Sequence, residues 1–289
     1  MCGFNCPKSS KQEYAWIAKY FGEKGLHFVY WLGYFGIKNQ NPHNLTIYNG
    51  GSFLNSGNEV PGLKPEIPLS LQKAICQHVG HHPTIQKVFV ESRPEFVTQG
   101  NISTLTELLQ GKTLQVGIGL ESSNNTVRNR MLRKGMSLSN FQRAVGILRE
   151  HKAESMAYVF LKPVGLSESE AIADAVNTIK FCFESGVNEV SLSCAFIQAE
   201  TEMCRQYKLG LYRPPWLWSI IEVVKQTAHL GPVKIGTFED DPPPIDVAHN
   251  CEHCTTAVNQ VLDQYRNSFN LSVFDQLACS CKQEWMKEV

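Results

Sequence analysis

Four cysteines near the C-terminus have the spacing of a zinc site. They form two close pairs, Cys251 with Cys254 and Cys279 with Cys281, and 24 residues separate the pairs. A C-x2-C pair and a second close pair together supply the four thiolates of a tetrahedral zinc centre. Two disulfides would need an oxidising compartment, and a redox-active C-x2-C pair would leave the second pair unexplained. We therefore predict that the four cysteines bind zinc, and that the flanking His249 or His253 could replace one of them.

Two further cysteines stand at the N-terminus. Cys2 and Cys6 are spaced C-x3-C, and Ser9 occupies the position where a C-x3-C-x2-C motif has its third cysteine. The complete motif is the usual carrier of a four-iron, four-sulfur cluster that binds S-adenosylmethionine. The pair by itself is equally compatible with two unrelated cysteines at a chain terminus, so the spacing alone leaves both interpretations open.

The elements that must position these residues alternate between strands and helices. Short apolar runs bounded by turn residues predict strands at residues 45–48, 87–90, 114–120, 157–161 and 189–192. Helical spacing fills the gaps, most clearly after Ser167, which forms a capping box with Glu170. Because a single helix carries the chain back to the same end of a sheet, we expect the strands to run parallel. The fold class is α/β, and periodicity alone does not separate a barrel from an open sheet.

Glycines and charged residues follow these predicted strands. In barrels and in open sheets alike, ligands bind at the C-terminal ends of the strands. Glycines there let the backbone approach a ligand closely, although a tight turn also uses them, and each charge could be a solvated loop residue. Their placement at successive strand ends favours one shared binding site. The candidate residues are Gly50, Gly51, Ser52, Glu91, Arg93, Glu121 and Lys162.

The composition changes near residue 232. Residues 239–244 read Glu-Asp-Asp-Pro-Pro-Pro, which cannot continue a helix or a central strand because each proline lacks an amide donor and has a fixed φ. We therefore predict two domains, one at residues 1–231 and the other, a linker with a small zinc-binding module, at residues 232–289.

Charge and hydropathy exclude other classes of protein. The 289 residues include 27 basic and 27 acidic side chains, so nucleic acid could be bound only by a local patch. Seven basic residues between Arg128 and Lys152 form either such a patch or an ordinary exposed helix face, and the aromatic run at residues 28–35 either stacks on bases or belongs to the core. No segment reaches the roughly 18 consecutive apolar residues of a membrane span. The N-terminus has no export signal, so we expect a cytoplasmic protein without a membrane partner.

Five segments of the chain carry a resemblance to a known family. They are residues 47–54 (Ile-Tyr-Asn-Gly-Gly-Ser-Phe-Leu), 90–97 (Val-Glu-Ser-Arg-Pro-Glu-Phe-Val), 116–122 (Val-Gly-Ile-Gly-Leu-Glu-Ser), 160–163 (Phe-Leu-Lys-Pro) and 212–219 (Tyr-Arg-Pro-Pro-Trp-Leu-Trp-Ser). They resemble the radical S-adenosylmethionine family of archaeosine biosynthesis, which is a relative of the radical S-adenosylmethionine domain in the elongator catalytic subunit. The resemblance runs from Cys2 to the four late cysteines and covers essentially the whole chain.

The resemblance implies a fold, cofactors and a reaction. The fold is a partial (β/α)6 barrel that encloses S-adenosylmethionine and a four-iron, four-sulfur cluster, and Cys2 is a cluster ligand. The turn at Gly50, Gly51 and Ser52 binds the methionine amino group, while the charged strand-end residues Glu91, Arg93, Glu121 and Lys162 face the cofactor. A partner enzyme joins lysine to a deazaguanine base in tRNA, and the radical enzyme cleaves a carbon-nitrogen bond of the adduct. The expected partners are therefore tRNA and a lysine-transferring tRNA enzyme, and no catalytic residue is identified.

The N-terminus departs from the family pattern. In the family, a first strand leads into a loop with two cysteines before the position that Cys2 matches, and the five predicted strands are one fewer than the six of the barrel. We therefore expect the native protein to begin upstream, and we expect the chain as given to lack two cluster ligands and hence a stable cluster. The alternatives are a radical enzyme with another substrate, and a non-catalytic, zinc-stabilised protein that binds tRNA or a partner on an incomplete barrel. Cys6 as a replacement ligand is a third option.

Overall fold

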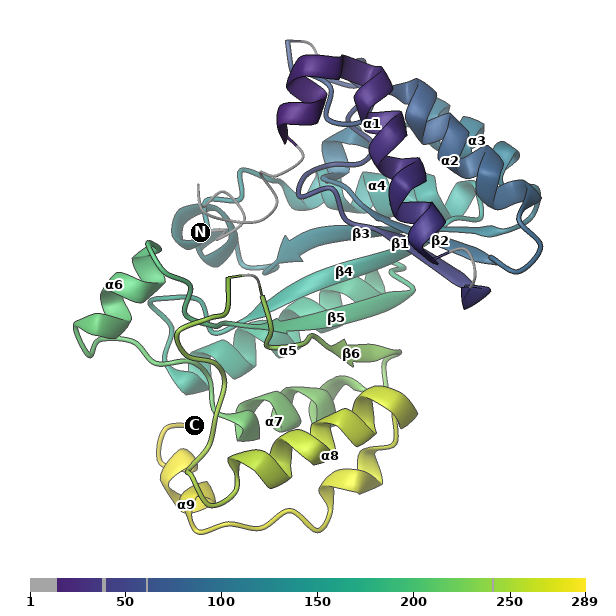
Figure 1. Cartoon of the computed structure of the whole chain (residues 1–289). Helices are drawn as coiled ribbons and strands as arrows, with labels where there is room; N and C mark the ends of the chain where they lie inside the picture. The colour runs from purple at the N-terminus through teal and green to yellow at the C-terminus, as the bar shows by residue number, and fades with distance from the viewer. Residues whose placement is uncertain (1–14, 38–39, 61, 241) are drawn as a thin grey trace. The chain divides into compact units, whose positions relative to one another are not determined.

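The computed structural model describes residues 15–37, 40–60, 62–240 and 242–289 (Figure 1). These residues divide into two compact units. The N-terminal unit contains residues 15–119 and 138–156 of this part of the chain, and the C-terminal unit contains residues 120–137 and 157–289.

Six strands form one sheet in which every strand lies beside its neighbour in sequence, in the order β1-β2-β3-β4-β5-β6. Their bounds are β1 Asn44–Ile47, β2 Lys87–Glu91, β3 Thr113–Glu121, β4 Glu154–Leu161, β5 Glu189–Cys194 and β6 Val233–Ile235. β1 pairs parallel with β2, β2 with β3, and β5 with β6. Sequential order and parallel pairing are the topology of a β/α barrel, so the predicted α/β class with partial-barrel topology is confirmed.

All five strands predicted from the sequence are present, and β6 adds a sixth. It was missed because it has only three residues and follows a proline. With β6 included, the described residues already supply six strands, so the strand count no longer argues for another strand before Met1. That expected strand lies outside the sequence, and Cys2 lies outside the described residues.

The N-terminal unit covers its strands with helices. These are α1 Ala15–Ile37, α2 Leu69–His81, α3 Gln99–Leu108 and α4 Leu138–Glu150, with a short 3-10 turn, η4, at Pro94–Phe96. α3 begins with a capping box between Thr98 and Asn101. Arg143 of α4 donates to the carbonyl oxygens of Pro94 and Val97, both at 2.8 Å, and so ties α4 to η4.

Helix α1 lies along α2 at the outer side of this unit (Figure 1). Its aromatic run is divided between two environments. Trp31 and Tyr34 contact the ring of His78 at centroid distances of 5.0 and 4.3 Å, whereas Phe28 and Phe35 are 62% and 56% exposed. The run is therefore neither wholly core nor wholly surface.

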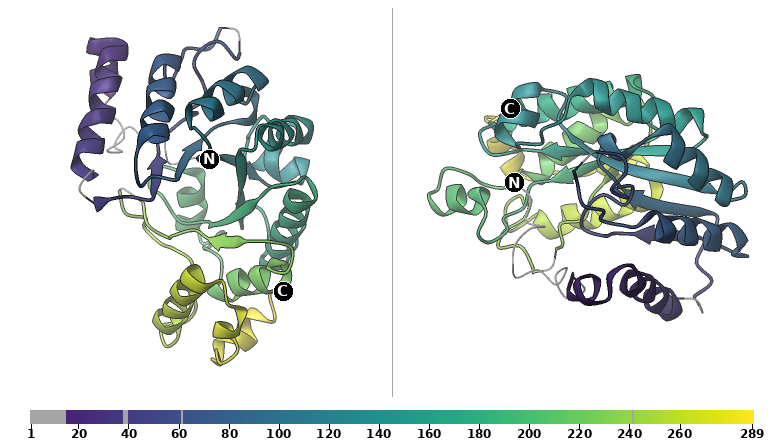
Figure 2. Two further views of the ribbon diagram at one scale, coloured as in Figure 1. Left: turned by 90° about the vertical axis from the view of Figure 1, so that its right-hand side faces the viewer. Right: turned by 90° about the horizontal axis from the view of Figure 1, so that it is seen from above.

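The C-terminal unit is built around α5 and α7. Its elements are η5 Thr126–Met131, α5 Glu168–Glu184, α6 Glu202–Lys208, α7 Leu217–Thr227, α8 Thr255–Ser268, η6 Leu271–Phe274 and α9 Cys281–Trp285. The predicted capping box of α5 is present: Ser167 N donates to Glu170 Oε2 at 2.9 Å, and Glu170 N donates to Ser167 Oγ at 3.3 Å. α7 packs against both α5 and α8, and the views in Figures 1 and 2 show α8 and α9 beside it.

The segment after residue 231 is joined closely to the rest of the C-terminal unit. It supplies β6, and residues 239–240 and 242–244 of the proline-rich stretch are irregular, as predicted. Gln198 Nε2 donates to Asp240 Oδ2 at 3.1 Å and to the carbonyl of Pro242 at 2.8 Å. Tyr265 of α8 donates to the carbonyl of Val233 at 3.0 Å. The boundary after residue 231 stays a prediction.

Two of the seven basic residues between Arg128 and Lys152 have structural roles instead of forming a positive surface. Arg128 is 2% exposed and donates to the carbonyls of Met136, Ser122 and Ser123, each at 2.9 Å. Arg143 donates to the backbone carbonyls of Pro94 and Val97. The run also divides between the two units, because residues 128–134 belong to the C-terminal unit and residues 143–152 to the N-terminal unit. Among the described residues, no helix is both long and apolar enough to cross a membrane.

Candidate functional site

In the N-terminal unit, the ends of β1 and β2 meet at the turn that contains Ser52. Ser52 is 3% exposed, and its Oγ accepts a hydrogen bond from the backbone amide of Arg93 at 3.1 Å. The next amide, Phe53 N, donates to the carbonyl of Glu91 at 2.8 Å. The structure therefore brings together three of the predicted strand-end residues. The side chain of Arg93 pairs with Glu95.

Both glycines of this turn are required by the local structure. Gly50 has a φ of +69°, which favours glycine. A Cβ on Gly51 would lie 1.7 Å from Glu66 Oε2, so only glycine lets this carboxylate approach. Glu66 Oε2 accepts from Ser52 N at 2.6 Å, and Glu66 Oε1 accepts from Asn55 Nδ2 at 3.2 Å. Glu66 carries no signal in the sequence, because it lies 14 residues from Ser52 in an irregular segment without periodicity.

In the C-terminal unit, the ends of β3 and β4 each have a charged residue in the left-handed region. Glu121 ends β3 with a φ of +65°, and Lys162 follows β4 with a φ of +62°. Such values are uncommon for residues other than glycine, and the residues that adopt them cluster at functional sites. Glu121 accepts from Lys134 Nζ at 2.8 Å. Both predicted site residues thus have conformations that the surrounding structure must hold in place.

Lys162 is held by buried partners. It is 5% exposed, and its ammonium pairs with the carboxylate of Glu168, whose side chain is 1% exposed. Tyr212 donates to the carbonyl of Lys162 at 2.6 Å. Burial and then the nearby Glu168 raise the pKa of Tyr212 well above its usual value, so this phenol stays protonated and remains a donor. In the sequence, Glu168 is only an acidic residue in the first turn of a predicted helix, a position that the helix dipole favours in any case.

The four late cysteines converge, as predicted. Their Sγ atoms all lie within 4.8 Å of one another. The Sγ of Cys251 lies 3.7 Å from that of Cys254 and 3.5 Å from that of Cys279, while those of Cys254 and Cys281 are 3.6 Å apart. Burial raises the pKa of the Cys254 thiol, whereas the backbone amide of Cys281 and the thiol of Cys251 lower the pKa of Cys279 to about 7. Four soft donors at these distances can hold a metal ion.

Among the described residues, the metal-binding group consists of the four cysteines and includes neither of the two flanking histidines. His249 Nδ1 lies 2.8 Å from the carbonyl oxygen of Val247 and 3.4 Å from Asp246 Oδ1, and His253 is exposed. The remaining cysteines with described positions are buried outside the group: Cys76, Cys182, Cys194 and Cys204. Burial raises the pKa of Cys76 to about 12 and has the same effect on Cys194. Buried free cysteines of this kind pack as small apolar residues.

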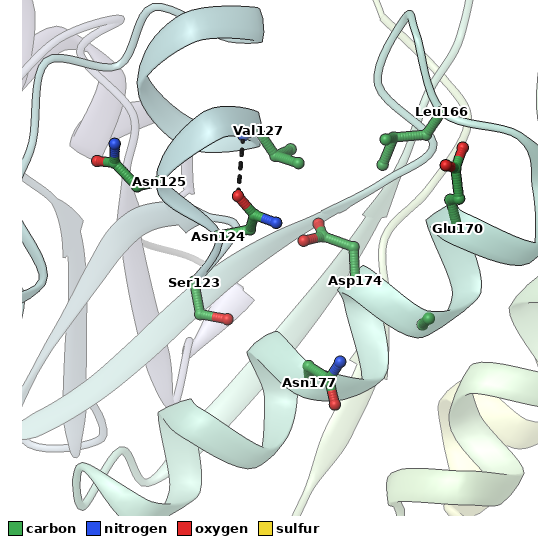
Figure 3. A pocket seen from close by; sticks show the side chains of 9 residues that line it. Ser123, Asn124, Asn125, Val127, Leu166, Glu170, Asp174 and Asn177 are labelled. Atoms are coloured by element: carbon green, nitrogen blue, oxygen red, sulfur yellow. Dashed lines mark hydrogen bonds between the residues drawn. The ribbon is translucent and has the colours of Figure 1, made fainter.

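A separate polar pocket of about 550 Å³ lies between η5 and α5 (Figure 3). Asp174 and Asn124 point into it from opposite sides. Asp174 Oδ1 accepts from Ser122 Oγ at 2.8 Å, and burial raises the pKa of Asp174. Glu170, on the same wall, is engaged in the capping box. The pocket contains none of the predicted site residues.

Comparison with known proteins identifies relatives that share most of the chain. Archaeosine synthase subunit beta of Methanosarcina acetivorans is 28% identical over 246 residues, which are 83% of this chain and 67% of that protein. Archaeosine synthase subunit beta of Thermococcus kodakarensis is also 28% identical, over 85% of this chain and 74% of that protein. The chain resembles archaeosine synthase subunit beta. The family resemblance inferred from the motifs is thereby confirmed, although no protein-family model matches the chain.

A solved structure supports the fold. The archaeal Elp3 of Methanocaldococcus infernus, without its N-terminal residues 1–46, superposes with a TM-score of 0.53 over 82% of this chain and 57% of that chain, at 17% identity. At this identity the likeness concerns the fold alone, and it agrees with the partial-barrel fold that the motifs implied. The chain spans about two thirds of the length of the curated relatives and little more than half of the solved chain.

Proposed function

We propose that this chain is part of a radical S-adenosylmethionine enzyme of tRNA modification, which cleaves a carbon-nitrogen bond of a lysine adduct on a deazaguanine base. The observation that carries the proposal is the match of 83% of the chain to a protein named archaeosine synthase subunit beta. The likeness of the fold to Elp3 is a second support. The strand-end residues that match the family motifs are the proposed cofactor site: Gly50, Gly51, Ser52, Glu91, Arg93, Glu121 and Lys162.

The chemistry of the strand ends fits S-adenosylmethionine. When bound beside a reduced cluster, this cofactor supplies hydrogen-atom abstraction. The turn at Ser52 holds the Glu66 carboxylate, and this acceptor suits the ammonium group of an amino acid. Glu121 and Lys162 would be preorganised by their left-handed backbone and their ion pairs. Cys2 is the cluster ligand that we propose, and it lies outside the described residues.

For the four late cysteines we propose zinc. Four sulfurs at about 2.3 Å from one tetrahedral ion are about 3.8 Å apart. The nearest Sγ pairs, at 3.5 to 3.7 Å, are close to that spacing. A four-iron cluster would hold its thiolates farther apart, because each thiolate binds a different iron. Four protein ligands leave no open position, so the zinc would be structural.

The proposed partners follow from the relatives. The two relatives are named as subunits, so we propose that this chain works with a second protein, a lysine-transferring tRNA enzyme. We propose that this chain and its partner act on tRNA. We also propose that residues 232–289 form a zinc-binding module and that the protein is cytoplasmic.

The test is reductive cleavage of S-adenosylmethionine. A version of the protein with all three cluster cysteines is reconstituted anaerobically with iron and sulfide and then reduced, and 5′-deoxyadenosine is measured by chromatography. We expect cleavage, and we expect Glu121→Gln to lower its rate. The matched control is Glu150→Gln, which removes an exposed carboxylate on α4 and should leave the rate unchanged. Absence of cleavage by a protein with an intact cluster would reject the enzymatic proposal in favour of a non-catalytic tRNA-binding or partner-binding protein.

If cleavage occurs, tRNA carrying the lysine adduct is the substrate to test. We expect loss of the adduct and release of the lysine-derived fragment, measured by mass spectrometry of the nucleosides. Cleavage of the cofactor without conversion of this tRNA would indicate another substrate.

A further inference from the structure

The ion pair at the end of β4 is connected to the first turn of α7. Glu168 Oε1 accepts from Trp216 N at 2.9 Å and from Ser219 Oγ at 2.5 Å, while its other oxygen faces the ammonium of Lys162. All these groups are buried. A buried carboxylate depends on such partners, because removing one of them leaves charge uncompensated in a medium of low dielectric constant.

The Ser219 hydroxyl that donates to Glu168 is itself held by a tryptophan near the C-terminal end of the chain. Trp285 Nε1 lies 2.8 Å from Ser219 Oγ, and Trp285 is 6% exposed. An indole N–H can only donate, so the hydroxyl must accept from it. The single hydrogen of the Ser219 hydroxyl is then available to Glu168. Trp285 thus orients a group that stabilises the carboxylate beside Lys162.

Trp285 belongs to the zinc-binding module proposed for residues 232–289, which contains the four cysteines. It is the last residue of α9, one helical turn after Cys281. The residue before Ser219 makes a second contact with the same module: Trp218 Nε1 donates to Cys281 Sγ at 3.4 Å. Adjacent residues of α7 therefore contact the metal-binding group on one side and the Glu168 carboxylate on the other.

We propose that Trp285 is a positioning residue for Lys162, acting through Ser219 and Glu168, so that metal binding at the four cysteines restrains a side chain of the strand-end site. The inference rests on the proposed function only in assigning Lys162 to the cofactor site. Its test needs neither cluster nor cofactor, so its failure is distinguishable from a failure of the cleavage assay.

The test measures how readily Lys162 reacts. Zinc-loaded full-length protein is treated with N-hydroxysuccinimidyl acetate, and the initial rates of acetylation at Lys162 and Lys180 are measured by mass spectrometry of peptides. Lys180 is exposed on the same helix as Glu168 and is the internal reference. Trp285→Phe keeps an aromatic ring but removes the donor. We expect the rate at Lys162, relative to Lys180, to rise about fivefold or more, as the loss of one buried hydrogen bond predicts, with zinc content unchanged.

Trp218→Phe is the matched control. It makes the same chemical change one residue from Ser219 and removes a donor to Cys281 without touching Glu168. We expect the wild-type rate at Lys162 while zinc remains bound. An equal rise in both variants would indicate general loosening of the module and would overturn the proposal, as would an unchanged rate in Trp285→Phe.

A double-mutant cycle tests the path. Ser219→Ala should also raise the rate at Lys162, and the double variant Trp285→Phe, Ser219→Ala should react no faster than the faster single variant, because both changes break one chain of contacts. Removing zinc with a chelator should raise the rate in the wild type but scarcely further in Trp285→Phe. Additive effects, or an equal response of the two proteins to zinc removal, would contradict a path through Trp285.

Discussion

Replacement of Cys254 by serine should abolish metal binding and lower the stability of the C-terminal unit. Cys254 is 7% exposed, and its Sγ lies 3.7 and 3.6 Å from those of Cys251 and Cys281. A metal that binds only the folded protein stabilises it by about 4 kcal/mol when the free metal concentration is a thousand times its dissociation constant. For a unit of about 150 residues this corresponds to about 8 to 16 °C in melting temperature. We therefore expect Cys254→Ser to melt lower by about that amount.

The unit should nevertheless stay folded without metal, because the apolar side chains of α8 are buried independently of the metal-binding group. Leu262 and Tyr265 are at most 1% exposed, and Tyr265 contacts Phe274 at a centroid distance of 5.2 Å. The wild type should therefore give a second, lower melting temperature after treatment with a chelator, and Cys254→Ser should melt at that lower temperature with or without zinc.

The assay combines metal analysis with calorimetry. Wild-type protein should carry about one zinc equivalent at this site, and Cys254→Ser about none. The control is Cys204→Ser, which makes the same change at a cysteine that is 3% exposed and lies outside the metal-binding group. It should keep its zinc and its response to the chelator. A full zinc equivalent in Cys254→Ser, or a wild-type melting temperature that the chelator does not change, would refute the assignment.

Three further predictions concern the strand ends and the neighbouring pocket. Arg128→Ala should lower the free energy of unfolding by about 3 kcal/mol, because carbonyls that accept from a buried cation lose their donor, and urea denaturation measures this. Gly51→Ala should lower the melting temperature by displacing Glu66, and should cost less in a Glu66→Ala background; an equal cost in both backgrounds would show that the close approach does not matter. Asp174→Asn should increase stability at pH 7, because a raised carboxyl pKa means that the folded state disfavours the charge. The gain should shrink as the pH falls toward that pKa and Asp174 becomes protonated, and a gain that grows in acid would contradict the argument.

Most of the fold could be predicted because its signals are local. The five predicted strands are runs of apolar residues, and the capping box of α5 depends on two residues three positions apart. β6 was missed because three residues carry too little pattern. The basic run was ambiguous for a different reason: residue type does not tell whether an arginine faces water or, like Arg128, donates to buried carbonyls.

The sequence by itself determined which residues are candidates for chemistry: the late cysteine pairs, whose spacing suits one ion, and the glycines and charged residues that follow the predicted strands. Only the tertiary structure decided their partners. The bond from Ser219 to Glu168 joins residues 51 positions apart, and that from Trp285 to Ser219 joins residues 66 apart. Such contacts leave no periodic trace in the chain, because they arise from the need to compensate buried polar groups, which exists only once the core has formed.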